Sequence, residues 1–118
     1  MKLNHLNLTV TDALEASQFL VKYFGLKPAE WVEPSKTFAL LLDPDMFVLT
    51  LMRGKRDQAP EYPQNFHIGF AQPNEEHVNE INRRLRADGY GVPEPARLHG
   101  SWTFYFTAPG GYTIEVLA

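Results

Sequence analysis

The sequence of 118 residues contains no cysteine. This absence excludes disulfide frameworks, thiolate zinc sites and cysteine nucleophiles, so a metal or catalytic site must use histidine, carboxylate or hydroxyl side chains. Positive charge is also scarce, because 11 Lys and Arg stand against 14 Asp and Glu and the formal net charge is −3. Without a basic stripe to neutralise phosphates, a nucleic acid is not an expected partner.

Long hydrophobic runs are missing as well. The clearly apolar stretches, such as Phe38 to Leu42, have the length of a strand and fall far short of the roughly 20 residues that a transmembrane helix needs. The sequence therefore predicts a cytoplasmic protein that does not enter a membrane. Hydrophobic residues still make up 44% of the chain, which is enough for a single domain over residues 1–118 with its own core.

The two halves of the sequence carry the same order of predicted elements, βαβββ. Module one, residues 1–53, has a strand at 3–10, a helix that begins after Thr11 and Asp12 and ends at Gly25, and strands near 29–33, 37–42 and 47–53. Module two, residues 65–118, has a strand at 65–71, a helix at about 74–88, and strands near 90–93, 102–107 and 112–117. Residues 54–64 contain two prolines and no periodicity, so they either link the modules or cover a cavity.

Similarity between individual residues supports an internal repeat. Residues 4–8 align with 66–70 at an offset of 62, and residues 43–51 align with 108–116 at an offset of 65. Two copies of one supersecondary unit in a chain are expected to pack about a pseudo-twofold axis, which brings equivalent positions together. His5 is then equivalent to His67, and Thr50 to Glu115.

Strand alternation places these four side chains on the polar face of their strands, opposite the apolar residues that should sit under the helices. One histidine alone is more often an ordinary hydrogen-bonded residue than a metal ligand. Two histidines at equivalent positions, with Glu115 inside an otherwise apolar strand, are costly to bury without a partner. The set His5, His67 and Glu115 therefore predicts a divalent-metal site with free coordination positions, in which Thr50 is a weak or absent fourth ligand.

Four motifs along the chain carry a family resemblance: residues 5–12 (HLNLTVTD), 23–26 (YFGL), 43–45 (DPD) and 109–115 (PGGYTIE). With them the chain resembles the vicinal oxygen chelate superfamily, which includes glyoxalase I, extradiol dioxygenases, fosfomycin-resistance thiol transferases and bleomycin-binding proteins. The resemblance implies an α+β fold in which two βαβββ modules form a cupped, eight-stranded mixed sheet with the helices on its outer face. Such a fold indicates the reaction poorly, because one fold serves several chemistries.

The resemblance also implies roles for individual residues. His5, His67 and Glu115 fall on three of the family's ligand positions, for an ion such as Mn, Fe, Ni or Zn. Thr50 falls where glyoxalase I carries an additional Glu, which argues against an ordinary glyoxalase I. Asn7 shares the face of His5, and we expect Asn7 and Thr50 to contact substrate.

Residues 103–106 (TFYF) resemble the Ser-Phe-Tyr-Phe segment of the fosfomycin enzymes, whose hydroxyls contact the phosphonate. Thr103 and Tyr105 are therefore further candidate substrate contacts, and Trp102 is a candidate aromatic contact in a ligand groove. No residue can be assigned as the general base, so the catalytic residues stay unknown.

Taken together, these features predict a metal-dependent enzyme that chelates a small oxygen-bearing substrate and stabilises an oxyanion, as a thiol transferase, a glyoxalase-like lyase or isomerase, or a dioxygenase. The alternative is a non-catalytic protein that sequesters a drug or another small molecule, as bleomycin-resistance proteins do. A third reading is a domain whose ancestral site persists without activity. We expect a homodimer, with the modules paired within one chain or exchanged between two.

Overall fold

The computed structural model describes residues 1–55 and 58–118. Its elements are β1 (His5–Val10), α1 (Ala13–Phe24), β2 (Lys27–Pro28), β3 (Phe38–Leu42), β4 (Val48–Arg53), β5 (Ile68–Ala71), α2 (Glu75–Ala87), β6 (Ala96–Leu98), β7 (Ser101–Ala108) and β8 (Tyr112–Leu117). Unit 1 contains Met1–Tyr62 and Pro109–Tyr112, and unit 2 contains Pro63–Ala108 and Thr113–Ala118. Residues 56 and 57, part of the predicted linker 54–64, lie outside the described residues.

The strands form two mixed sheets of four, in the orders β1-β4-β3-β2 and β5-β8-β7-β6. In each sheet the first strand pairs in parallel with the last strand of its module, β1 with β4 and β5 with β8. This arrangement confirms the predicted α+β fold of two βαβββ modules. The joining of both sheets into one eight-stranded cup stays a prediction.

The strand registers reproduce the internal repeat residue by residue. Asn7 lies opposite Thr50 in the β1/β4 pair, and Gly69 lies opposite Glu115 in the β5/β8 pair. Gly69 follows Asn7 by 62 residues and Glu115 follows Thr50 by 65 residues, which are the two offsets of the sequence alignment. Each module therefore builds its first and last strands in the same register.

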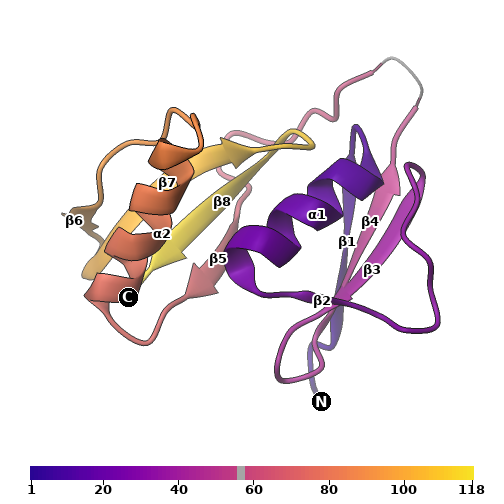
Figure 1. Cartoon of the computed structure of the whole chain (residues 1–118), viewed down its shortest axis with the longest axis horizontal. Helices are drawn as coiled ribbons and strands as arrows, with labels where there is room; N and C mark the ends of the chain where they lie inside the picture. The colour runs from indigo at the N-terminus through magenta and orange to yellow at the C-terminus, as the bar shows by residue number, and fades with distance from the viewer. Residues whose placement is uncertain (56–57) are drawn as a thin grey trace. The chain divides into compact units, whose positions relative to one another are not determined.

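Each sheet buries one face under its helix, as the alternating pattern predicts. Helix α1 packs on β3 and β4, and α2 packs on β7 (Figure 1). The fully buried apolar side chains of these faces include Leu8, Val10, Leu51, Ile114 and Val116. The odd-numbered residues of β1, which begin with His5 and Asn7, are left on the opposite face.

Both helices begin and end where capping groups stand. The Asp12 carboxylate accepts a hydrogen bond from the Glu15 N–H, and the Asn74 side chain accepts one from the His77 N–H, which satisfies otherwise unpaired donors of the first turn. Helix α1 ends at Gly25, whose φ of 68° is left-handed and suits glycine. Neither helix of the described chain is long and apolar enough to cross a membrane.

Two predicted strands are misplaced. The strand expected near 29–33 is instead the two-residue β2, because the Val32 N–H donates to the Ala29 carbonyl and turns the chain there. The strand expected near 90–93 is β6, which begins at Ala96. Residues 90–95 contain two prolines, which cannot donate to a strand ladder.

Tyr62, at the end of unit 1, fastens the chain to the free edge of β1. Its hydroxyl accepts a hydrogen bond from the Thr9 N–H (2.9 Å) and donates one to the Thr9 carbonyl (2.7 Å). Burial raises the pKa of Tyr62, and the backbone hydrogen bond with Thr9 opposes that rise. One side chain thus satisfies both backbone hydrogen-bonding groups of Thr9 at the edge of the sheet.

The two hydrogen bonds between Tyr62 and the Thr9 backbone predict an effect on stability. Tyr62→Phe leaves the Thr9 N–H and carbonyl without this partner, so we expect the free energy of unfolding to fall by about 2 kcal/mol. Tyr112→Phe is the matched control, because the buried Tyr112 hydroxyl has no hydrogen-bond partner in the described part of the chain. In urea denaturation the control should be at least as stable as the wild type. An equal loss of unfolding free energy in both variants would contradict a stabilising role of the Tyr62 hydrogen bonds.

Candidate functional site

Three neighbouring strands of unit 2 bring polar side chains to one face of their sheet. Glu115 is on the inner strand β8, Tyr105 and Thr103 are on β7, and His67 comes directly before β5. Trp102 and Ala118 exchange backbone hydrogen bonds, so β7 runs antiparallel to β8 and Tyr105 lies opposite Glu115. The cluster therefore follows from strand order and alternation alone.

The Glu115 carboxylate is the centre of this cluster. Its Oε1 accepts a hydrogen bond from the Thr103 hydroxyl at 3.0 Å, and its Oε2 lies 3.3 Å from Nε2 of His67. Tyr105 also hydrogen bonds to the carboxylate, and its ring stands edge-on to the His67 ring at a centroid distance of 5.3 Å. The Glu115 side chain is only 12% exposed, so these polar contacts compensate for water lost on burial.

The two ring nitrogens of His67 have different neighbours. Its Nδ1 lies 3.0 Å from the backbone carbonyl of Asn65, and a carbonyl only accepts, so Nδ1 carries the proton. In the neutral ring Nε2 then has a free lone pair, which faces a carboxylate oxygen that also carries lone pairs. A cation between two such atoms, either a proton or a metal ion, stabilises the contact, so the chemistry of His67 and Glu115 fits two positions of a divalent-metal site.

Unit 1 carries the equivalent positions with different chemistry. His5 is exposed, and its Nδ1 lies 2.7 Å from the side-chain oxygen of Asn4, which leaves Nε2 available as in His67. Where unit 2 has Gly69 and Glu115, unit 1 has Asn7 and Thr50. The Thr50 hydroxyl donates to Oδ1 of Asn7 at 2.7 Å. Among the described residues, neither unit by itself gathers three His, Asp or Glu side chains that could hold a metal ion.

Not all candidate substrate contacts join these groups. The Trp102 indole N–H donates to Asn79 of α2 at 2.7 Å, and the Arg97 guanidinium lies over the Trp102 ring. Trp102 thus lies on the helix side of β7, away from Thr103. Thr103 is itself 1% exposed, and its hydroxyl is directed to Glu115. Tyr105 remains partly exposed beside His67.

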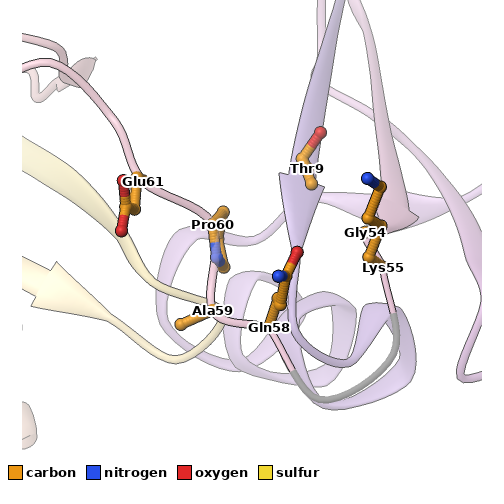
Figure 2. Close-up of a pocket in the computed structure, with 7 residues that line it drawn as sticks. All are labelled: Thr9, Gly54, Lys55, Gln58, Ala59, Pro60 and Glu61. Carbon is orange, nitrogen blue, oxygen red and sulfur yellow. The ribbon is translucent and has the colours of Figure 1, made fainter.

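A pocket of about 560 Å³ lies beside the C-terminal half of β1 in unit 1. Figure 2 shows its lining residues, Thr9, Gly54, Lys55, Gln58, Ala59, Pro60 and Glu61. Gly54 is required by the close approach of the chain here, since a Cβ at this position would lie 2.9 Å from the Thr9 methyl group. None of the predicted ligand or substrate residues lines this pocket.

Known proteins share the sequence pattern and the fold. The family model described as Glyoxalase/Bleomycin resistance protein/Dioxygenase superfamily matches residues 2–116. The chain belongs to this superfamily. No curated protein matches it in sequence.

Solved structures of this superfamily's fold align over nearly the whole chain. A possible glyoxalase from Bacillus cereus is 49% identical, with a TM-score of 0.88, 100% of this chain and 99% of that chain covered. The fosfomycin resistance protein FosX from Listeria monocytogenes is 26% identical, with a TM-score of 0.76 and 100% and 93% covered. Lactoylglutathione lyase from Agrobacterium tumefaciens is 20% identical, with a TM-score of 0.76 and 98% and 92% covered, and shows the fold alone.

The sequence did not indicate how Glu115 is held. Alternation along residues 101–108 and 112–117 places Thr103, Tyr105 and Glu115 on one face, and the pairing of these strands brings them into contact. From the resemblance to fosfomycin enzymes, we had expected the hydroxyls of Thr103 and Tyr105 to contact substrate. No sequence pattern predicted the contact of the Asn65 backbone carbonyl with Nδ1 of His67.

The contact between Tyr105 and Glu115 predicts a titration. The hydrogen bond to the carboxylate, with smaller effects of burial and of its negative charge, raises the pKa of Tyr105 above 10.0. Glu115→Gln removes the charged acceptor, so the pKa of Tyr105 should fall back toward 10.0 in NMR titrations of ¹³C-labelled tyrosine. Tyr62, whose pKa is raised by burial, should not respond, and an unchanged Tyr105 would contradict the contact.

Proposed function

We propose that this member of the superfamily is a divalent-metal-dependent enzyme that acts on a small oxygen-bearing substrate. The observation that carries the proposal is the pairing in unit 2 of a ring nitrogen, Nε2 of His67, with a carboxylate oxygen of Glu115 at 3.3 Å. A pair of this kind on a sheet face suits an ion that accepts imidazole and carboxylate ligands.

The proposed ligands are His67 and Glu115 of unit 2 and His5 of unit 1. Support for His5 comes from its place in the repeat and from its Nδ1 contact with Asn4, which leaves Nε2 for a metal. Mn, Fe, Ni and Zn all accept this donor set. When bound, such an ion acts as a Lewis acid that stabilises negative charge on a substrate oxygen. A small-molecule substrate and a homodimer remain part of the proposal.

The substrate oxygen would meet hydrogen-bond donors of the chain's own strands. Asn7 is exposed two residues after His5 on the same strand face. Because its Oδ1 accepts the Thr50 hydroxyl, its amide nitrogen is directed away from that contact and can donate to a developing oxyanion. Tyr105 is partly exposed beside His67 and would contact the same substrate with its ring, because its hydroxyl proton is directed to Glu115.

Metal binding tests the proposal directly. The chelated protein is titrated calorimetrically with Mn²⁺, Ni²⁺, Zn²⁺ and Fe²⁺, and elemental analysis is run on the purified protein. We expect about one equivalent per chain in the wild type and its loss in His5→Ala, His67→Ala and Glu115→Ala, because three ligands are needed to complete the site. His77→Ala is the matched control, since His77 is at the start of α2.

If the wild-type protein bound no metal ion, the proposal of a metal-dependent enzyme would be wrong. Binding of a drug such as bleomycin by that metal-free protein would then favour the sequestering alternative. Metal binding that survives Glu115→Ala would instead show that another group of side chains holds the ion.

The oxyanion donor makes a separate prediction about catalysis. The metal-loaded protein is assayed for thiol transfer to epoxides, isomerisation of thiol adducts and ring cleavage of catechols. For the reaction that the wild type performs, Asn7→Leu should lower kcat/KM by about 100-fold while its metal affinity stays at the wild-type value. Thr50→Val should have a smaller effect in the same direction, because it removes only the group that orients Asn7. A fully active Asn7→Leu would exclude this donor role.

A further inference from the structure

The carboxylate of Glu115 is held from both sides by neighbouring strands. His67, next to β5, faces Oε2 at 3.3 Å, whereas Thr103 on β7 donates to Oε1 at 3.0 Å. The two oxygens of one carboxylate therefore have different partners, and Tyr105 of β7 is a further partner of the carboxylate. Whichever group fixes Oε1 also fixes the direction in which Oε2 points.

Thr103 is built for that task better than for contact with a ligand. It is 1% exposed, the least exposed of the polar residues of the described core. Threonine is stiff at χ1, so a buried threonine holds its hydroxyl in one direction. The hydroxyl has a single proton to donate, and that proton is given to Glu115.

On the other side of Glu115, the paired residue of β5 has no side chain. Gly69 lies directly across from Glu115 in the β5/β8 pair, and a Cβ there would come within 3.9 Å of Oε2. Beside Oε2 the paired position on β5 therefore has no side chain, whereas Oε1 is in contact with the Thr103 hydroxyl.

We propose that Thr103 is a positioning residue that fixes Glu115 so that Oε2, beside Nε2 of His67, is the oxygen presented to a metal ion. This inference rests on the proposed function for the identity of the ligand, and it gives Thr103 a role other than the substrate contact suggested by the family resemblance. Hydrogen-bond partners of ligating carboxylates commonly change metal affinity by about 10- to 100-fold.

The first test measures affinity for Ni²⁺ and Mn²⁺ alone by calorimetry. Thr103→Val keeps the shape of the side chain and removes the hydroxyl, so its affinity should fall by about 10- to 100-fold. Thr103→Ser restores the donor and should restore affinity. Thr107→Val is the matched control, because Thr107 is an exposed threonine on the same strand and the same face, and its affinity should equal that of the wild type.

The second test uses the metal-free proteins, so that it does not depend on metal binding. Long-range ¹H–¹⁵N NMR reads the ring nitrogens of His67, and Thr103→Val should shift the Nε2 signal while Thr103→Ser and Thr107→Val leave it in place. Thr103→Ala serves as a second hydroxyl-free variant if the valine disturbs packing. An unchanged Nε2 signal in a folded hydroxyl-free variant overturns the inference, whatever the metal result. A wild type that binds no metal defeats the proposed function, while the NMR result still decides whether Thr103 positions Glu115.

Discussion

A carboxylate buried on an inner strand is the constraint on which unit 2 depends. Glu115 lies between Ile114 and Val116, both fully buried, and it can meet its need for polar contacts only on the other face of the sheet. The groups that contact it there come from the strands on either side. That requirement accounts for the polar residues of β7 and for the histidine before β5, while the helix covers the apolar face.

The two modules apply one backbone geometry to different chemistry. In unit 2 the paired positions hold Gly69 and Glu115, which places a carboxylate opposite a residue without a side chain. In unit 1 the same positions hold Asn7 and Thr50, which hydrogen bond to each other without any charge. A duplicated module can therefore offer an anionic ligand from one copy and a neutral donor from the other, since register is retained while the side chains differ.

The fold could be predicted further from the sequence than the site could. Alternation and capping residues placed β8 and the end of α1 at Gly25, because both are local signals. The short strands β2 and β6 were misplaced because their positions depend on partner strands and on prolines. The repeat indicated Glu115, but the contacts of Tyr62 and Thr103 were missed. Each joins residues distant in sequence through one hydroxyl, and neither leaves a periodic pattern.

The replacement of a glutamate by Thr50 bears on the charge of the proposed site. Two neutral imidazoles and one carboxylate around a divalent cation leave a net charge of about +1, whereas a second carboxylate would bring it to zero. A residual positive charge strengthens the attraction for a substrate that gains negative charge on oxygen as it reacts. The hydrogen bond from Thr50 to Asn7 adds an oriented neutral donor without cancelling that charge. Under the proposed function, a donor set with only one carboxylate would therefore suit a substrate that gains negative charge on oxygen as it reacts.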